Sequence, residues 1–263
     1  MSRSAVIIVL LINIVSCFVF RVFIHRGRMN IYDFSADENQ APKEASILIA
    51  GIANQPYSAF RELGKSVSAD PMIYAEYSCF GWNARNSAAQ LERLQYDRNT
   101  LVSVYAISVG DKIARRLNRC QHIYSINPCP HPSVLKDKFQ RILPVVSFVS
   151  EVLVFFLGWI ATIPFIPTEE NVRYSLALLA DQLWEISVRR DTPPGNRGIT
   201  SVIFSTYDEY IVPTRVMKFY KCPTIQYVTI DSKHARTSDL TWSKDYDNAI
   251  MALKERRKNY VTD

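Results

Sequence analysis

The chain has 263 residues, which is enough for one large globular domain and too few for two domains of typical size. The net charge is +6, but the 31 Lys and Arg residues are mixed with acids through most of the chain, so the composition argues against a nucleic-acid partner. Five cysteines without a Cys-x-x-Cys pair or a nearby His pattern argue against a disulfide framework and a zinc site.

An apolar run lies at the start of the chain. Residues 5–20 are apolar apart from Asn13 and two small polar residues, and the run continues past Arg21 to Ile24. A helix that crosses a bilayer needs about 20 such residues, a length that the run reaches if the Arg21 side chain extends to the interface. The sequence therefore predicts a membrane anchor or signal segment within residues 1–28.

The charges beside this run predict its orientation. Arg3 precedes it and Arg residues follow it at positions 21, 26 and 28, which favours a single-pass anchor with the main domain on the cytoplasmic side. Cleavage is the alternative, because Ile14–Cys17 resembles a bacterial lipoprotein processing site in which Cys17 would carry the lipid. The strongly apolar residues after Cys17 favour the uncleaved anchor.

Residues 29–45 are predicted to be a linker, because most of this stretch is polar and short of β-branched residues. From Ser46 onward, short apolar runs alternate with helical patterns. Strands that are apolar on both faces and alternate with helices indicate a parallel, helix-covered α/β sheet in one domain over residues 46–263. The predicted strands are Ile47–Ala50, Met72–Ala75, Leu101–Ile107, His122–Ile126, Ser201–Ser205 and Thr224–Ile230.

The third predicted strand runs directly into Ser108 and then into a helical pattern, as a nucleophile elbow requires. Such an elbow leaves room only for small residues two positions before and after the serine, where Ala106 and Gly110 stand. The amide of Val109 would then point at the oxyanion of a substrate carbonyl. The alternative for Ser108 is a helix N-cap in any parallel α/β fold. Three basic residues of the helical pattern are expected to face solvent: Lys112, Arg115 and Arg116.

A long insertion separates the fourth and fifth predicted strands at roughly residues 130–198 and is too long for a simple crossover. We expect it to form a helical cap. Leu143–Pro167 is almost wholly apolar, and a helix with Thr168 as its N-cap is predicted to follow. A second membrane span at Leu143–Ile163 is the alternative, but Glu151 near its middle and the prolines at its end favour the cap.

A candidate catalytic side chain follows each of the last two predicted strands. Asp208 comes a turn after one of them, and His234 lies in a polar loop after the other. Serine, acid and histidine thus occur in one of the known chain orders of a catalytic triad. Glu209 is the rival acid, but neighbours on such a turn point to opposite sides, so only one of the two reaches His234. The remaining histidines are less suited as the base: His25, His122 and His131.

Residues 46–263 resemble the α/β-hydrolase superfamily, with Ala106–Gly110 as the elbow AISVG, Asp208–Pro213 as the acid turn DEYIVP and Asp231–Arg236 as the histidine loop DSKHAR. The resemblance implies a mostly parallel sheet covered by helices, with the helical cap inserted before the acid-bearing strand. The sequence departs from the family pattern at three positions: Ala50 replaces a common histidine, Ala106 replaces the first glycine of the elbow, and Asp111 replaces a small apolar residue.

The resemblance also implies roles for the candidate residues. Ser108 is the expected nucleophile, His234 the base and Asp208 the group that orients the imidazole. The second oxyanion amide of the family comes from the loop after the first strand of the core, which assigns it to Ile52, with Ala53 as the alternative in register. No metal and no organic cofactor are implied, because the triad supplies its own nucleophile.

Together these features predict a membrane-tethered serine hydrolase that cleaves an ester, or a related acyl bond, of an apolar acyl compound or lipid. The apolar cap would cover Ser108, and the anchor would keep the site near lipids. The alternative is a catalytically inactive protein of the same fold that serves as a binding or scaffold protein at the membrane. The departures around the elbow motivate that alternative.

Overall fold

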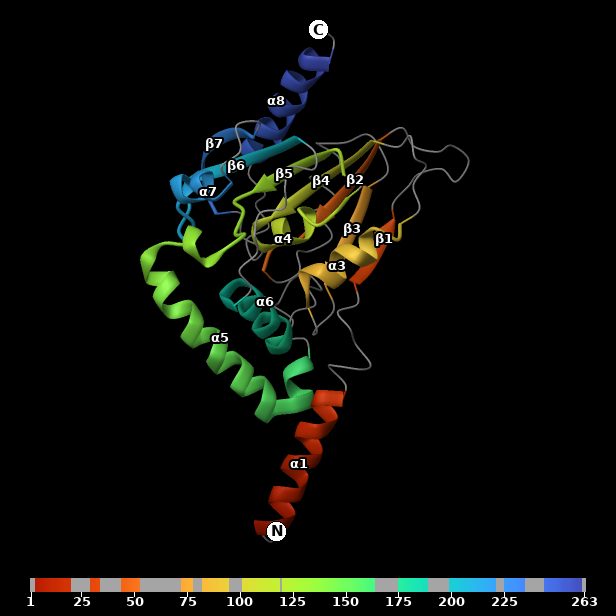
Figure 1. The fold of residues 1–263 in the computed structure, drawn as a ribbon, viewed down its shortest axis with the longest axis vertical. Coiled ribbons are helices and arrows are strands. Elements are labelled where there is room, and N and C mark those ends of the chain that lie inside the picture. Colours follow the sequence, from red (N-terminus) through yellow and green to blue (C-terminus); the bar gives the residue numbers. More distant parts are fainter. Residues whose placement is uncertain are drawn as a thin grey trace.

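A mostly parallel sheet forms the centre of the protein (Figure 1). The computed structural model describes residues 3–19, 29–33, 44–52, 72–77, 82–94, 101–118, 120–163, 175–188, 199–220, 225–234 and 244–261. Within these residues seven strands lie in the order β1-β3-β2-β4-β5-β6-β7. The strands are β1 (Met29–Asp33), β2 (Glu44–Ile49), β3 (Met72–Tyr77), β4 (Leu101–Ile107), β5 (His122–Ile126), β6 (Ile199–Tyr207) and β7 (Gln226–Lys233). Strands β2 to β7 are parallel, which confirms the predicted sheet.

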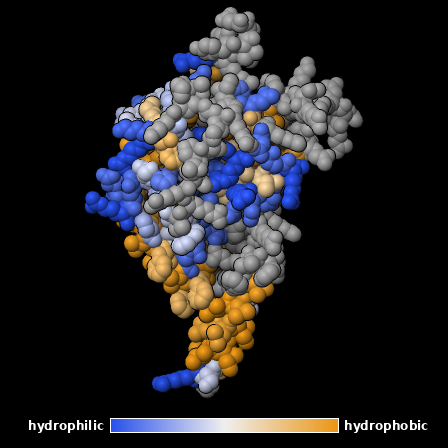
Figure 2. Space-filling model, in the orientation of Figure 1, coloured by the Kyte–Doolittle hydropathy of each residue, from blue (hydrophilic) through white to orange (hydrophobic). Residues whose placement is uncertain are grey.

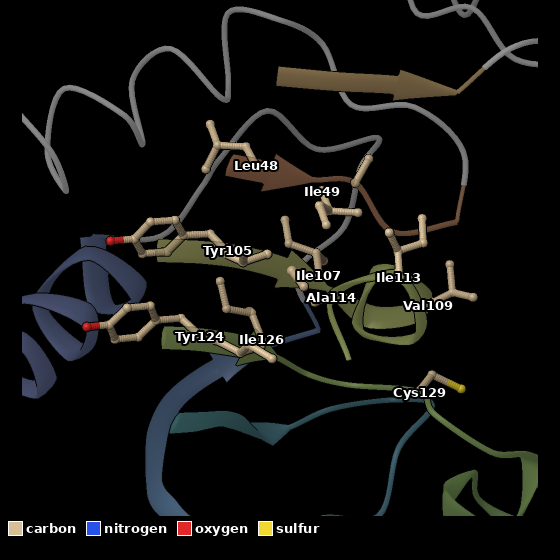
Figure 3. Packing of buried hydrophobic residues seen from close by; sticks show 14 of the residues in the cluster. Leu48, Ile49, Tyr105, Ile107, Val109, Ile113, Ala114, Tyr124, Ile126 and Cys129 are labelled. Carbon is tan, nitrogen blue, oxygen red and sulfur yellow. The ribbon is translucent and has the colours of Figure 1, made fainter. Parts of the chain in front are cut away.

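The middle of the sheet is buried on both faces. All five side chains of β5 are buried, and so are those of β4 from Val102 onward. This is why these strands are apolar without alternation in the sequence. Tyr105 of β4 and Tyr124 of β5 are partners in register, and their rings stack with centroids 4.9 Å apart (Figure 3).

The predicted linker at residues 29–45 is corrected at both of its ends. Its first five residues form β1, which pairs antiparallel with β3 from Met29 opposite Tyr77 to Asp33 opposite Ile73. At its other end, β2 already begins at Glu44. Five residues are too few to show a strand pattern, so the sequence did not distinguish this edge strand from a linker.

Helices surround the sheet. They are α1 (Arg3–Val19), α3 (Ala84–Leu91), α4 (Asp111–Ala114), α5 (Asp137–Leu157), α6 (Leu176–Val188), α7 (Pro213–Tyr220) and α8 (Lys244–Val261), with 3₁₀ turns η2 (Ser108–Gly110), η3 (Pro132–Val134) and η4 (Gly158–Thr162). Helix α4 packs on β2, β4 and β5, and α8 packs on β6 and β7. Helix α1 projects away from the sheet at the end of the molecule opposite to α8 (Figure 1).

The insertion between β5 and β6 contains two long helices. Helix α5 leads away from the sheet, η4 turns the chain, and α6 packs along α5, between α5 and the sheet (Figure 1). Thr168, the predicted N-cap, lies outside the described residues. In the described part of the chain, α5 is the helix that is long and apolar enough to cross a membrane by length and composition, and α1 is shorter.

Candidate active site

Ser108 stands at the sharp turn between β4 and η2. Its backbone φ is +49°, in the left-handed region that a non-glycine residue rarely adopts, and its side chain is buried. A strained conformation of this kind costs about 1–3 kcal/mol and persists where the surrounding structure imposes it. The strain matches the elbow predicted from the strand-to-helix pattern.

Gly110 is the residue that allows the turn to pack against β2. A Cβ atom at this position would lie 2.5 Å from the carbonyl oxygen of Ala50 and 3.0 Å from that of Ile49. Both obstacles are backbone atoms of β2 and its end, so neither can rotate away. The spacing of Ser108 and Gly110 in the sequence therefore reflects a real close approach of η2 to β2.

Asp208 and His234 are in direct contact. Asp208 Oδ2 lies 2.6 Å from Nδ1 of the imidazole, and its Oδ1 accepts hydrogen bonds from the amides of Tyr210 and Ile211, both at 2.8 Å. Asp208 is 4% exposed, so the two amides and the imidazole are the groups that fix its carboxylate. A carboxylate held in this way orients the imidazole and favours the tautomer with the proton on Nδ1.

Glu209, the rival acid, contacts His234 at a different atom. Its Oε2 accepts a hydrogen bond from the backbone N–H of His234 at 3.3 Å. The two acids therefore both reach His234, but Asp208 alone of the two has a hydrogen bond to the ring in the structure. The loop that precedes His234 is also corrected, because Asp231–Lys233 belongs to β7 and His234 follows that strand directly.

The three candidate triad residues lie along one edge of the sheet. Ser108, Asp208 and His234 follow the carboxyl ends of β4, β6 and β7, which are parallel strands of one sheet. The carboxyl edge of such a sheet is where α/β proteins place their sites. The order of the strands thus places all three at the same edge, where Asp208 and His234 are in contact, while among the described residues no hydrogen bond joins Ser108 Oγ to His234.

The loop after β2, which carries the predicted oxyanion residue Ile52, runs beside Ser108. A Cβ atom at Gly51 would lie 3.3 Å from Cβ of Ser108, and Ile52 is the next residue, half-buried against the core. Val109, the other predicted donor, is buried in η2 directly after Ser108. Ala53, the alternative to Ile52, lies outside the described residues.

Comparison by sequence finds no matching family model and no matching curated protein. Comparison by structure finds an esterase from Exiguobacterium antarcticum, with a TM-score of 0.59 and 10% identity over 88% of this chain and 96% of the esterase. An enol-lactonase from Burkholderia xenovorans has a TM-score of 0.57 and 12% identity over 87% of this chain and 96% of its own. A monoacylglycerol lipase from Paleococcus ferrophilus has a TM-score of 0.55 and 10% identity over 86% of this chain and 98% of the lipase.

The chain has the α/β-hydrolase fold. In this α/β-hydrolase fold the cap is joined to the acid turn by several hydrogen bonds. The backbone N–H of Lys136, just before α5, donates to the carbonyl of Tyr210 at 2.8 Å, and its Nζ donates to the carbonyl of Asp208 at 2.6 Å. Arg215 of α7 forms an ion pair with Asp137, the first residue of α5, at 2.7 Å. The acid turn and the first turn of α5 are therefore one packed unit.

A buried polar network supports the histidine in this α/β-hydrolase fold. The Asn127 side-chain N–H₂ donates to the hydroxyl of Tyr246 at 2.7 Å and to that of Ser205 at 3.0 Å. The Tyr246 hydroxyl in turn donates to the carbonyl of Lys233 at 2.9 Å, one residue before His234. Sequence reasoning missed this network, because Asn127 follows β5 while the other members come from β6, β7 and α8, with no common motif.

Asp111 is the departure from the family pattern that the structure explains most fully. It is completely buried and forms an ion pair with Arg115 at 2.7 Å, and it accepts hydrogen bonds from the hydroxyls of Ser125 and Tyr220. Its carboxylate thus ties the helix after the nucleophile to β5 and α7. A small apolar residue at this position could make none of these contacts.

Two of the three basic residues predicted to face solvent do not do so: Lys112 of α4 and Arg115 directly after it. Lys112 is 2% exposed, and its Nζ donates to the carbonyl of Glu185 in α6 at 2.8 Å. The guanidinium of Arg115 stacks on the Tyr220 ring at 3.7 Å. Although burial lowers the pKa of Arg115, the charge of Asp111 and the contact with Tyr220 raise it above its ordinary value, so Arg115 stays a cation. The cap helix α6 and helix α7 cover a face that sequence periodicity assigned to solvent.

Replacing Asp111 by asparagine is expected to lower the free energy of unfolding by about 3–5 kcal/mol, because Arg115 would remain buried without its counter-charge. The matched control is Tyr220→Phe, which removes one hydrogen bond and leaves the ion pair, at a cost of about 1–3 kcal/mol. Urea unfolding monitored by circular dichroism measures both values. Equal stability of Asp111→Asn and the wild type would contradict this account of the buried pair.

Cys129 lies close to Ser108, and its backbone N–H donates to the carbonyl of Ser108 at 3.0 Å. Burial raises the pKa of the Cys129 thiol to about 12. A thiol is nucleophilic as its anion, so a raised pKa makes Cys129 a weaker nucleophile at neutral pH. Within the described residues no group of three His, Cys, Asp or Glu side chains could hold a metal ion.

Proposed function

We propose that the protein is a membrane-tethered serine hydrolase that cleaves an ester, or a related acyl bond, of an apolar acyl compound or lipid. The 2.6 Å contact between Asp208 and His234, on the sheet edge that also carries Ser108, is the observation that carries the proposal. The esterase and the lipase whose folds resemble this chain support the same reaction class.

In the proposed reaction, Ser108 Oγ attacks the substrate carbonyl carbon while Nε2 of His234 takes the serine proton. The amides of Val109 and Ile52 stabilise the negative oxygen of the tetrahedral intermediate. When the intermediate collapses, the leaving alcohol takes the proton from His234 and the acyl group stays on Ser108. Water, deprotonated by His234, then attacks the acyl ester, and His234 returns the proton to Ser108 Oγ as the carboxylic acid leaves.

We further propose that α1 tethers this hydrolase to a membrane, with the α/β domain on the cytoplasmic side. Helix α1 projects from the domain (Figure 1). Its exposed side chains are almost all apolar. The larger number of Arg residues after the apolar run than before it supports the orientation. The substrate would then be an acyl compound that dissolves in, or is part of, the lipid phase.

Labelling with a fluorophosphonate probe tests the proposed reaction. The activated Ser108 Oγ would displace fluoride and form a stable phosphonyl ester. We expect labelling of the detergent-solubilised wild type, none of Ser108→Ala, and labelling of His234→Ala slowed about a thousandfold or more. Circular dichroism checks that each variant is folded. A folded wild type that is not labelled would favour the inactive binding or scaffold protein over the hydrolase.

A further inference from the structure

The polarity of α5 is the reverse of that expected for a helix on the surface of a water-soluble domain. The face that packs inward holds Leu143, Ser147, Ser150 and Val154. The outward face is more apolar than the inward face, and its exposed members are Ile142, Val145, Val146, Phe148, Val149, Leu153, Phe155 and Phe156. Between residues 142 and 157 the one charged residue is Glu151, which lies on the inward face by its spacing from Ser147 and Val154. A surface helix in water buries its apolar stripe instead.

The packing inside the cap also differs from that expected for helices on a water-soluble domain. Helices α5 and α6 meet through small side chains, because Ala177 and Ala180 of α6 pack with Val154 of α5 and Ala161 of η4. The buried Ser147 hydroxyl in the same face has no hydrogen-bond partner among the described residues. Small residues between closely packed helices, with large apolar residues outside, are typical of helices surrounded by lipid.

Helix α1 docks on the far end of this cap. The side chain of Asn13, the polar residue within the apolar run, packs on Gly158, where α5 ends with a φ of +54°. A Cβ atom at Gly158 would lie 2.8 Å from Nδ2 of Asn13, so the contact requires a glycine there. Helix α1 also contacts α5 and η4. The polar Asn13 amide thus faces protein and not the surroundings.

The exposed apolar surfaces of α1, α5 and η4 are continuous. In Figure 2 they form one hydrophobic region at the end of the molecule that carries the N-terminus, while the coloured residues away from that end are mainly hydrophilic. The region ends at the first turns of α5, where Asp137, Lys138 and Arg141 are exposed beside the acid turn. A continuous patch of this size on a soluble protein marks an interaction surface.

We infer that α5 and η4, with the part of α1 that packs on them, form a single platform embedded in one leaflet of a phospholipid bilayer, with Asp137, Lys138 and Arg141 at the level of the headgroups, while the rest of α1 continues into the bilayer as the proposed tether. Helix α5 does not cross, because α6 covers its inward face and returns the chain to the α/β domain, where Gln182 hydrogen-bonds the carbonyl of Gly51 at 3.5 Å. The substrate class rests on the proposed function: the substrates are acyl lipids drawn from that leaflet. The acid turn of the active site then lies at the polar rim of the platform.

Photolabelling of the full chain in phosphatidylcholine vesicles tests the platform. A diazirine that partitions into the bilayer is activated, and the labelled residues are mapped by mass spectrometry. Phe148, 64% exposed, should be labelled several times more strongly than Tyr207, which is 62% exposed but lies on the α/β domain. Label confined to α1 would overturn the inference. Label absent from α5, with cross-linking of α5 to a second copy, would overturn it in favour of a self-association surface.

The labelling is repeated on Ser108→Ala, so its outcome does not depend on whether the protein is a hydrolase. If hydrolysis is found, Leu153→Glu should lower the hydrolysis of vesicle lipid about tenfold or more, because a carboxylate is costly inside the bilayer. The same variant should leave the hydrolysis of a soluble short-chain ester within about twofold. The control is Met251→Glu on α8, since Met251 is 47% exposed and Leu153 is 45% exposed. Equal lipid hydrolysis by the two variants would overturn the inference.

Discussion

Asp208→Asn is expected to lower kcat for ester hydrolysis about ten-thousandfold without unfolding the protein. In the structure Oδ1 of Asp208 accepts two backbone hydrogen bonds and Oδ2 faces Nδ1 of His234. An asparagine can keep the first pair by placing its carbonyl oxygen there. Its NH₂ group then donates to Nδ1, which forces the imidazole proton onto Nε2, so the ring can no longer accept the proton of Ser108.

Steady-state kinetics on a short-chain ester, with urea unfolding as the check on the fold, measures this effect. The matched control is Glu209→Gln, in the adjacent residue. Glu209 contacts the backbone N–H of His234, and an amide oxygen can accept the same hydrogen bond, so kcat should change by less than about tenfold. A larger loss of kcat in Glu209→Gln than in Asp208→Asn would reverse the assignment of the acid.

Gly110→Ala is expected to cause the second large effect, on stability and activity together. The new methyl group would lie 2.5 Å from the carbonyl oxygen of Ala50, and that backbone is held in place because Tyr77 donates a hydrogen bond to the same oxygen. To relieve this clash, η2 would have to move away from β2, and Ser108 would move with η2. We expect a loss of about 3 kcal/mol or more in the free energy of unfolding, at the upper end of the usual cost of overpacking.

Gly51→Ala is the control for this prediction, because its methyl group would meet Cβ of Ser108 at 3.3 Å and no atom more closely. Its cost in stability should stay below about 1.5 kcal/mol. Thermal and urea unfolding of both variants, with fluorophosphonate labelling of Ser108, separate lost folding from a displaced nucleophile. Gly110→Ala with wild-type stability and labelling would show that η2 does not need its close approach to β2.

The parts of the fold that the sequence predicted are those set by local pattern. Strands β4 and β5 are apolar on both faces, and the elbow is a short motif in which Ser108 and Gly110 are two residues apart. Strand β1 was missed because an edge strand of five residues, with one partner strand, needs little apolar surface.

The supports of the site could not be predicted, because their partners are distant in the chain. Asp111 is hydrogen-bonded to Tyr220, which lies 109 residues later in the chain, and Asn127 is hydrogen-bonded to Tyr246, 119 residues later. Periodicity along the sequence carries no information about such pairs. It also assigned Lys112 to solvent, since nothing in the local sequence shows that α6 of the cap covers it. The choice between Asp208 and Glu209 likewise needed the geometry of the turn.

The hydrogen bonds between the start of α5 and the acid turn determine where the cap could be replaced by the cap of another protein. The chain enters the cap after β5, but its first residues are held by the end of β6 and by α7. Lys136 hydrogen-bonds the carbonyls of Asp208 and Tyr210, and Asp137 forms an ion pair with Arg215. A chimera joined before Lys136 would remove a hydrogen bond from the backbone of Asp208, the candidate acid. A chimera joined after Asp137 would keep it, so a graft of the cap has to begin inside the first turn of α5.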